Sequence, residues 1–204
     1  MVTNKREFFD EVAAKGNLLL FREEELVKVA KLKQRLGPLT GLKVLEPGCG
    51  AGPLTEYLAE WVGPTGRVLA FDSSPNMVNA CRQRLVDRVN VEILCGSAET
   101  LELTPRTWDL VMLFRVFPHF EDKELVLRKF RTSLVPGGRL VIAHFEGSAQ
   151  LNARHASFSE PVRYDRMPSL PDLRDLLQRT GFTVSLAIDT DEELFVQART
   201  NTEV

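Results

Sequence analysis

Three glycines at alternate positions, Gly48, Gly50 and Gly52, constrain the fold of this chain more than any other feature of its sequence. Residues 42–45 before them form a short, mostly apolar run, which indicates a buried strand. Residues 53–61 after them carry apolar side chains at helical spacing. A strand, a glycine-rich turn and a helix make up the first half of a nucleotide-binding βαβ unit. Free N–H groups at the start of such a helix favour a negatively charged ligand group.

The glycine spacing separates two kinds of nucleotide site. A dinucleotide-binding fingerprint reads G-x-G-x-x-G. This chain instead reads G-x-G-x-G, with Pro53 where the third glycine of a dinucleotide site would stand. Glu46 precedes the first glycine by two residues. The pattern E-x-G-x-G-x-G resembles motif I of the class I S-adenosylmethionine (SAM) methyltransferases, and a structural glycine-rich turn in another α/β domain is the alternative.

The resemblance implies roles for the residues of this motif. In the family, the glycines let SAM lie against the loop, and the acidic residue supports the methionine end of the cofactor. Carried over to this chain, the resemblance assigns Glu46, Gly48, Cys49 and Gly50 to cofactor binding.

The next expected strand covers residues 67–72 and ends with Asp72. This aspartate lies 20 positions after Gly52, the last glycine of the motif. An acid at this place can accept hydrogen bonds from both ribose hydroxyls of a nucleotide. We therefore expect Asp72 and its neighbour Ser73 to contact the cofactor. The alternative is that Asp72 or Ser74 serves only as the N-cap of the helix that follows.

Two later stretches match the family in the same order. The segment after the strand over residues 89–95 corresponds to an element that meets the adenine, with a serine in place of the more usual aspartate. The family's fourth strand, here residues 108–114, ends near a histidine-containing loop beside the sulfonium. A methionine in the helix after Ser74 is a further adenine contact, with core packing as the favoured alternative. The resemblance thus adds to the expected cofactor contacts Met77, Ser97, Ala98, Glu99 and Phe114.

The order of the expected elements defines a fold class. Helices over residues 5–15 and 18–36 make up an N-terminal cap over residues 1–39, and strands and helices then alternate. Two strands over residues 182–188 and 193–199 end the chain as a hairpin, whereas a dehydrogenase continues in parallel βα units. We expect an α/β, Rossmann-like class I methyltransferase fold. Its sheet would have seven mostly parallel strands, an antiparallel C-terminal strand and helices on both faces.

The composition of the chain limits the kinds of molecule that it is expected to bind. A length of 204 residues fits a single domain over residues 1–204, and a net charge of −2 with a pI of about 6.0 gives no strongly basic surface for nucleic acid. No apolar run reaches transmembrane length, and residues 1–10 lack the apolar region of a secretory signal. The cysteines Cys49, Cys81 and Cys95 follow no pairing pattern. We expect a cytoplasmic protein with reduced thiols, no nucleic-acid partner and no membrane span.

The resemblance as a whole covers about residues 40–199 and is to the broad small-molecule group related to the quinone-biosynthesis methyltransferases. It implies methyl transfer from SAM to a small-molecule acceptor, with S-adenosyl-L-homocysteine as the product. The sequence leaves open the acceptor, whether O, N, S or C is methylated, and the oligomeric state. A SAM-binding protein without catalysis is one alternative, and an RNA methyltransferase, which the charge balance disfavours, is another.

Residues 146–168 follow the fifth expected strand as a long, polar and irregular segment. A connection of this length is more often a functional lid than a plain link between elements. We expect this segment to close over the acceptor.

The chain has three histidines, His119, His144 and His155. His119 follows the fourth expected strand, His144 ends the fifth, and His155 lies in the expected lid. All three can therefore face one crevice at the carboxyl ends of the strands. His144 is the leading candidate to orient or deprotonate the acceptor, helped by His119 or His155. A structural role for each is one alternative. A metal site built from the three imidazoles is another and is not preferred, because no carboxylate or cysteine obviously completes it.

Overall fold

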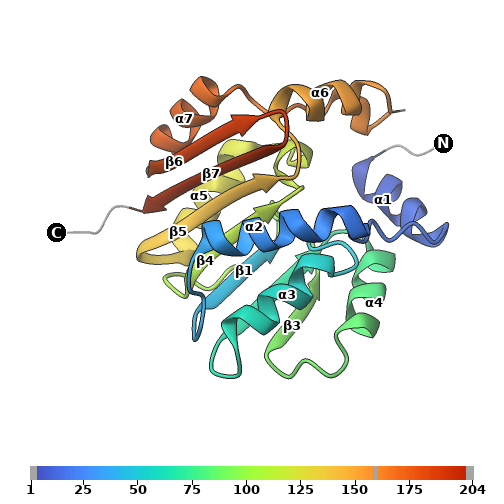
Figure 1. Cartoon of the computed structure of the whole chain (residues 1–204), viewed down its shortest axis with the longest axis horizontal. Helices are drawn as coiled ribbons and strands as arrows, with labels where there is room; N and C mark the ends of the chain where they lie inside the picture. Colours follow the sequence, from blue (N-terminus) through green and yellow to red (C-terminus); the bar gives the residue numbers. More distant parts are fainter. Residues whose placement is uncertain (1–3, 159, 201–204) are drawn as a thin grey trace.

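The computed structural model describes residues 4–158 and 160–200. Within these ranges the strands join one seven-stranded sheet in the order β3-β2-β1-β4-β5-β7-β6 (Figure 1). The strands are β1 (Lys43–Pro47), β2 (Arg67–Asp72), β3 (Val91–Cys95), β4 (Trp108–Phe114), β5 (Leu134–His144), β6 (Phe182–Thr190) and β7 (Glu193–Thr200). β1 to β5 pair in parallel, and β7 lies antiparallel to both β5 and β6. The expected class I methyltransferase fold is confirmed.

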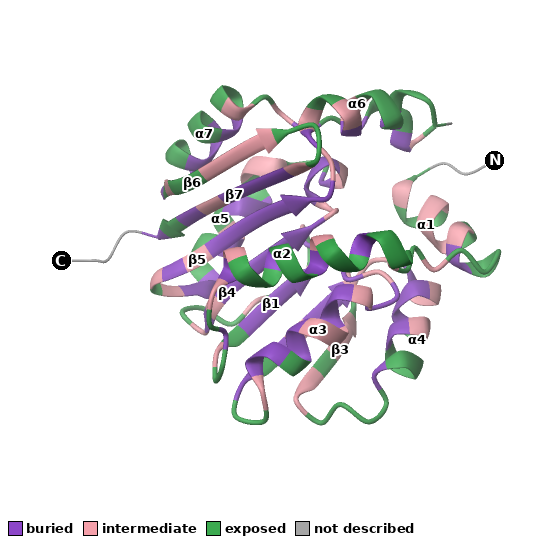
Figure 2. Cartoon of the chain, in the orientation of Figure 1, coloured by how far each residue is buried: buried purple, intermediate pink, exposed green. Residues whose placement is uncertain are grey.

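Helices cover both faces of the sheet. They are α1 (Lys5–Ala14), α2 (Leu26–Leu36), α3 (Pro53–Val62), α4 (Pro75–Arg84), α5 (Lys123–Ser133), α6 (Ser148–Ala156) and α7 (Leu170–Arg179), with short 3₁₀ turns η1 (Glu23–Glu25), η2 (Phe117–His119) and η3 (Val162–Tyr164). Residues of α5, α6 and α7 share one hydrophobic core, and residues of α2, α3 and α4 share the other. Figure 2 shows the buried strands between these layers and the exposed outer sides of the helices. No helix in the described ranges is both long and apolar enough to cross a bilayer.

The strand order reverses beside β1, and this reversal positions the site. From β1 the sheet grows outward through β2 to β3, and the chain then returns to place β4 on the other side of β1. Ligands of open α/β sheets bind at the carboxyl ends of the strands at such a switch point. The glycine loop after β1 and the loop after β4 both lie there.

Several expected boundaries differ from the structure by one or two residues, and two segments differ more. The helix expected over residues 18–36 begins only at Leu26, because the backbone of Leu19, with a φ of 51°, and that of Arg22, with a ψ of 158°, are not helical and the turn η1 precedes the helix. The carboxylate of Glu25 accepts a hydrogen bond from the N–H of Arg22 at 3.1 Å, which starts the helical turn there. The segment over residues 146–168, expected to be irregular, contains the helix α6 and the turn η3.

Helix α1 docks beside the start of α4, near the carboxyl ends of the strands (Figure 1). The carboxylate of Asp10 forms the hydrogen bonds that hold the two helices together. Asp10 accepts hydrogen bonds from the Ser74 hydroxyl at 2.7 Å, the Asn76 N–H at 2.8 Å and the Asn76 side-chain amide at 2.9 Å. Ala13 of the same helix packs against Met77 in a small apolar cluster. The N-terminal helix is therefore bound to the strand end that carries Asp72.

We predict that Asp10→Ala loosens α1 without disturbing the sheet. The substitution removes three hydrogen bonds to a charged acceptor, each typically worth about 1.5–3 kcal/mol. Amide hydrogen exchange of residues 5–14 should rise at least ~10-fold, because local opening becomes cheaper in free energy. The matched control is Glu11→Ala, which removes only an exposed ion pair with Lys15 at 3.2 Å. Unchanged exchange in Asp10→Ala would show that other contacts hold the helix.

Candidate functional site

The glycine loop places two of its glycines against neighbouring side chains and leaves one facing open space. Gly48, Gly50 and Gly52 have φ values of 69°, 54° and 80°, a region that residues with a Cβ rarely adopt. A Cβ on Gly48 would lie 2.2 Å from Cγ2 of Val116, and one on Gly52 would lie 2.7 Å from Sγ of Cys81. A Cβ on Gly50 would meet no atom within 4 Å. Gly50 is thus the point of the loop that a ligand can approach closely.

Asp72 at the end of β2 binds the glycine loop directly. Its Oδ2 accepts from the N–H of Gly50 at 2.9 Å, and its Oδ1 accepts from the N–H of Ser74 at 2.9 Å. Burial raises the pKa of Asp72, against the opposing effect of these hydrogen bonds. The N-cap of α4 is Ser74, whose hydroxyl accepts from the N–H of Met77 at 3.1 Å. Asp72 is therefore not the helix cap, and its carboxylate binds the backbone N–H of Gly50.

Glu46 is a buried acid without a full set of partners. Its side chain, near the end of strand β1, is 2% exposed, and its Oε2 has no hydrogen-bond partner among the described residues. Burial raises the pKa of Glu46 to about 8, with a smaller opposing effect from the nearby Thr55 hydroxyl and a reinforcing one from Asp72. The Thr55 hydroxyl is itself buried without a hydrogen-bond partner within the standard distance. A cationic ligand group near Glu46 would restore its charged form.

The other expected cofactor residues next to Asp72 lie close together in space. The N–H of Gly96 donates to the carbonyl of Asp72 at 2.9 Å, which brings the loop after β3 to the end of β2. In that loop the Ser97 and Thr100 hydroxyls are 3.0 Å apart, and Glu99 accepts from the N–H of Glu121 at 3.3 Å. Ser97 and Glu99 thus lie in the loop that is expected to contact the adenine, close to the end of β2.

Four of the expected contacts are embedded in packing. Ala98 is buried, Ser73 is half-buried beside Asp72, and Met77 packs between Ala13 and Ala51. This surrounding of Met77 matches the core-packing alternative. Phe114 ends β4 with its ring 4.9 Å from that of Phe145.

Cys49 of the motif lies beside Cys81, and both are buried as free thiols. A hydrogen bond between the two side chains, together with burial, raises the pKa of the Cys49 thiol well above its usual value. Both cysteines therefore pack as small, unreactive side chains behind the loop.

Two of the three histidines contact one residue that the sequence did not single out, Asp165: His119 contacts its carboxylate and His155 its backbone carbonyl. The rings of His119 and His155 are 5.0 Å apart. Nδ1 of His119 is 2.6 Å from Oδ2 of Asp165, and Nδ1 of His155 is 3.0 Å from the Asp165 carbonyl. Nζ of Lys5 lies 2.8 Å from Oδ1 of the same carboxylate. The segment 146–168 and the N-terminal helix thus meet at this cluster.

His144, the leading candidate for the base, is buried more deeply than expected. Its side chain is 2% exposed, and neither ring nitrogen has a hydrogen-bond partner. Burial lowers its pKa well below the usual value, and the nearby charges of His119, Arg115 and His155 act in the same direction. The imidazole is therefore neutral at physiological pH, and both of its nitrogens are buried without a partner among the described residues.

A metal site receives no support from the described part of the chain. No group of three or more histidine, cysteine, aspartate or glutamate side chains lies close enough there to hold an ion. The histidines instead use their nitrogens on Asp165 or leave them unpaired.

Sequence reasoning missed a second charged residue at the switch point, Arg115, directly after β4. Its φ of 57° is unusual for a residue with a side chain and is a local strain of the kind found at functional sites. The guanidinium pairs with buried Glu25 and lies over the rings of Phe145 at 4.8 Å, Phe114 at 5.1 Å and Phe21 at 5.7 Å. The arginine in L-F-R-V was the visible signal, but its ion-pair partner, Glu25, lies 90 residues away in the sequence.

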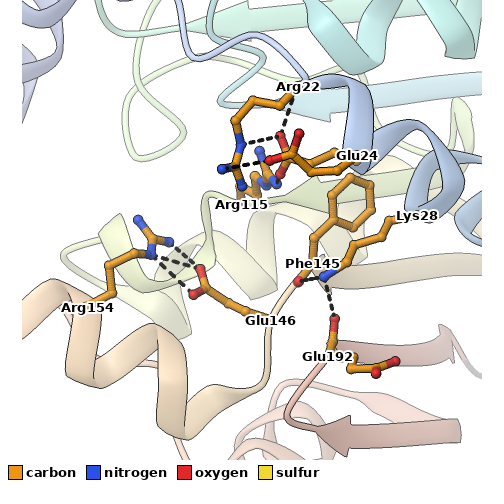
Figure 3. Close-up of polar contacts among 9 residues, drawn as sticks. Arg22, Glu24, Lys28, Arg115, Phe145, Glu146, Arg154 and Glu192 are labelled. Atoms are coloured by element: carbon orange, nitrogen blue, oxygen red, sulfur yellow. Dashed lines mark hydrogen bonds and ion pairs between the residues drawn. The ribbon is translucent and has the colours of Figure 1, made fainter.

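Figure 3 shows Arg115 beside the residues around the turn η1, and Arg154 of α6 paired with Glu146, with Nε to Oε1 at 3.0 Å. On the other side of Phe145, Lys28 donates to the Phe145 carbonyl at 2.7 Å. A surface groove of about 400 Å³ runs here between α2, the end of β5 and the start of β7. No residue of the glycine loop lines it, so it is separate from the crevice around Gly50.

We predict that Glu46→Gln changes how stability depends on pH. The folded-state pKa of about 8 lies above the ordinary value of 4.5. The folded protein therefore keeps a proton that the unfolded chain releases, and stability falls as pH rises from about 5 to 8. Relative to Glu46→Gln, the wild type should lose up to ~1.4 kcal/mol per pH unit in this window, measured by urea unfolding.

The control for this prediction is Glu60→Gln on the exposed side of α3. Its pH profile should parallel that of the wild type. Parallel profiles of the wild type and Glu46→Gln would show that Glu46 ionises normally in the folded state.

Comparison with known proteins places these features in a family. Residues 44–138 match the family described as "Methyltransferase domain". The demethylmenaquinone methyltransferase of Lactococcus lactis is 34% identical over 142 residues, which cover 67% of this chain and 56% of that protein. A ubiquinone/menaquinone biosynthesis C-methyltransferase of Hahella chejuensis is 31% identical over 145 residues, covering 67% and 57%. The chain thus spans less than three fifths of the length of these curated relatives.

Solved structures agree with this fold over nearly the whole chain. A SAM-dependent methyltransferase from Aquifex aeolicus, 22% identical, superposes with a TM-score of 0.70 over 97% of this chain and 99% of its own. A Haloferax volcanii protein described as the putative methyltransferase in a complex with the Trm112 activator, 18% identical, gives a TM-score of 0.77 over 98% and 100%. A domain of this family implies SAM as its cofactor. The chain therefore carries a class I SAM-dependent methyltransferase domain.

Proposed function

We propose that the protein transfers a methyl group from SAM to a small-molecule acceptor in the crevice at the carboxyl ends of β1, β2 and β4. One observation carries the proposal: a Cβ on Gly50 would meet no atom within 4 Å, while Asp72 accepts from the N–H of the same glycine and Glu46, at the end of β1, is buried with an unpartnered oxygen. This arrangement fits a ligand with vicinal hydroxyls and a cationic end. When bound, SAM supplies a methyl group on a positively charged sulfur.

The cofactor-binding roles follow from the chemistry of each group. Both Asp72 oxygens already accept one N–H each and retain lone pairs for the ribose hydroxyls. Glu46 gains a counter-ion from the cationic methionine end, which offsets the cost of its burial. Ser97 and Glu99 lie at the end of β3, where hydrogen bonds to the adenine amino group and ring nitrogen are expected.

The acceptor would lie between the N-terminal cap and the segment 146–168, beside the histidines. His144 is well suited to bind a polar group of the acceptor, because its two buried nitrogens lack partners within the protein. Its lowered pKa makes it a weaker base than an ordinary histidine. The relatives named for quinone biosynthesis support a small aromatic acceptor over a macromolecule.

Calorimetry with SAM and with NAD tests this function. We expect heat of binding with SAM and none with NAD. Gly50→Ala should weaken SAM binding at least ~10-fold, because the methyl group would occupy the open side of the loop. Tight NAD binding without a SAM signal would overturn the proposal.

The matched control is Gly63→Ala, which lies beyond α3 at the opposite end of the sheet. Gly63 also has a positive φ, 66°, and open space around its Cβ position. A side chain at either glycine strains the backbone, because L-residues rarely adopt a positive φ, and Gly63, with a ψ of −172°, lies in a region essentially restricted to glycine. Gly63→Ala should therefore lower the melting temperature but leave SAM affinity unchanged. Equal loss of affinity in both variants would mean that strain, and not the ligand contact, is being measured.

A further inference from the structure

Asp165 connects three parts of the chain at the edge of the crevice. It follows η3 in the segment 146–168, and its side chain is 5% exposed. Its two carboxylate oxygens have different partners: Oδ2 is 2.6 Å from Nδ1 of His119, and Oδ1 is 2.8 Å from Nζ of Lys5. Lys5 also donates to the His119 carbonyl at 2.9 Å. The carboxylate is held from both sides in one orientation.

This carboxylate keeps its negative charge. Burial acts to raise the pKa of Asp165, but the hydrogen bonds from His119 and Lys5 outweigh burial and lower it. An ionised carboxylate has no proton to donate. Nδ1 of His119 must therefore carry the proton of the hydrogen bond, whether or not the ring is charged.

The tautomer leaves Nε2 as the accepting nitrogen of the neutral ring. No residue in the described ranges forms a hydrogen bond with Nε2 of His119. The ring is held edge-on by Phe9 at 5.1 Å and lies 5.0 Å from the ring of His155. Its side chain keeps 16% of its surface exposed, whereas His144 is 2% exposed and so nearly closed to solvent. Of the three histidines, His119 is the one with a carboxylate partner on one nitrogen and access on the other.

We propose that Asp165 is a positioning residue that fixes His119 as the general base, so that the acceptor must carry an ionisable hydroxyl. This inference rests on the proposed methyltransferase function. Methyl transfer to such an acceptor releases one proton, which Nε2 of His119 accepts. A bond would form between the acceptor's nucleophilic atom and the methyl carbon while the methyl–sulfur bond breaks with its electron pair left on sulfur. The acceptor's proton goes to Nε2, so charge and atoms balance without any further reactant.

The two carboxylate oxygens of Asp165 have different partners, His119 and Lys5, so the substitution Asp165→Asn tests the proposal. The amide that replaces the carboxylate has one accepting oxygen and one donating NH₂ group. Lys5 can only donate, so it takes the oxygen, and the NH₂ group then faces Nδ1 of His119. Nδ1 must become an acceptor, and the proton moves to Nε2. We expect ¹⁵N NMR of the ring nitrogens to show Nδ1–H in the wild type and Nε2–H in this variant.

Activity should follow the tautomer. The probe acceptor is a short-chain 1,4-dihydroxynaphthalene with radiolabelled SAM as donor, and its 1,4-dimethoxy analogue is the acceptor without an ionisable proton. We expect turnover of the dihydroxy probe to fall at least ~100-fold in Asp165→Asn, the range for a lost general base. SAM affinity by calorimetry should stay unchanged, and the dimethoxy analogue should not be methylated.

The double variant Lys5→Met/Asp165→Asn separates orientation from structural damage. Without Lys5 the amide is free to turn its oxygen toward Nδ1, which restores Nδ1–H. Turnover should recover at least ~10-fold relative to Asp165→Asn alone. The matched control Lys5→Met should keep the Nδ1–H tautomer and most of the turnover. A merely structural role for Asp165 predicts that the double variant is worse than either single variant.

Three results would overturn the inference. They are an Nε2–H tautomer in the wild type, a changed tautomer in Asp165→Asn with unchanged turnover, and methylation of the dimethoxy analogue as fast as the dihydroxy probe. The wild-type spectrum needs neither a variant nor an acceptor, so the assignment is testable even if Asp165→Asn fails to fold. Absence of SAM binding by the wild type would instead overturn the proposed function, which the spectrum does not test.

Discussion

The close contact between the loops after β1 and β4 is the constraint on which the rest of the site depends. Position 48 has no room for a side chain, because a Cβ there would lie 2.2 Å from Val116. The N–H groups of Gly48 and Cys49 both donate to the Phe71 carbonyl, at 2.7 and 3.1 Å. These contacts hold the ends of three adjacent strands together. They place the N–H of Gly50 within reach of Asp72 and keep the open side of that glycine toward the crevice.

The buried ionisable side chains of this region fall into two groups, one without polar partners and one with them. Glu46 and His144 are buried with unpartnered polar atoms, which costs free energy in the absence of a ligand. Asp165 and Glu25 are buried with cationic partners, which offset that cost. The unpaired groups belong to the two strand ends that face the crevice, and the paired groups belong to the segments that cover it. A bound ligand would satisfy the first set without disturbing the second.

The covering segments come from both ends of the sequence and are tied to the same loop after β4. The N-terminal part reaches this loop through Lys5 and through Glu25, which pairs with Arg115. The segment 146–168 reaches it through Asp165. One of these contacts, the hydrogen bond between Asp165 and His119, also orients the histidine ring.

The sequence by itself determined the sheet and the nearness of the glycine loop to the end of the second strand. Strands 67–72 and 108–114 lie as expected, because apolar runs between turn residues leave little choice of boundary. The glycines near Asp72 are recognisable from the sequence because each stands where the backbone has a positive φ, a conformation that other residues rarely adopt. Only the tertiary structure decided that helix α2 starts at Leu26 and that Asp165 meets His119. Local periodicity carries no information on a contact between side chains 46 residues apart, since such a contact exists only after the sheet and its covering helices have packed.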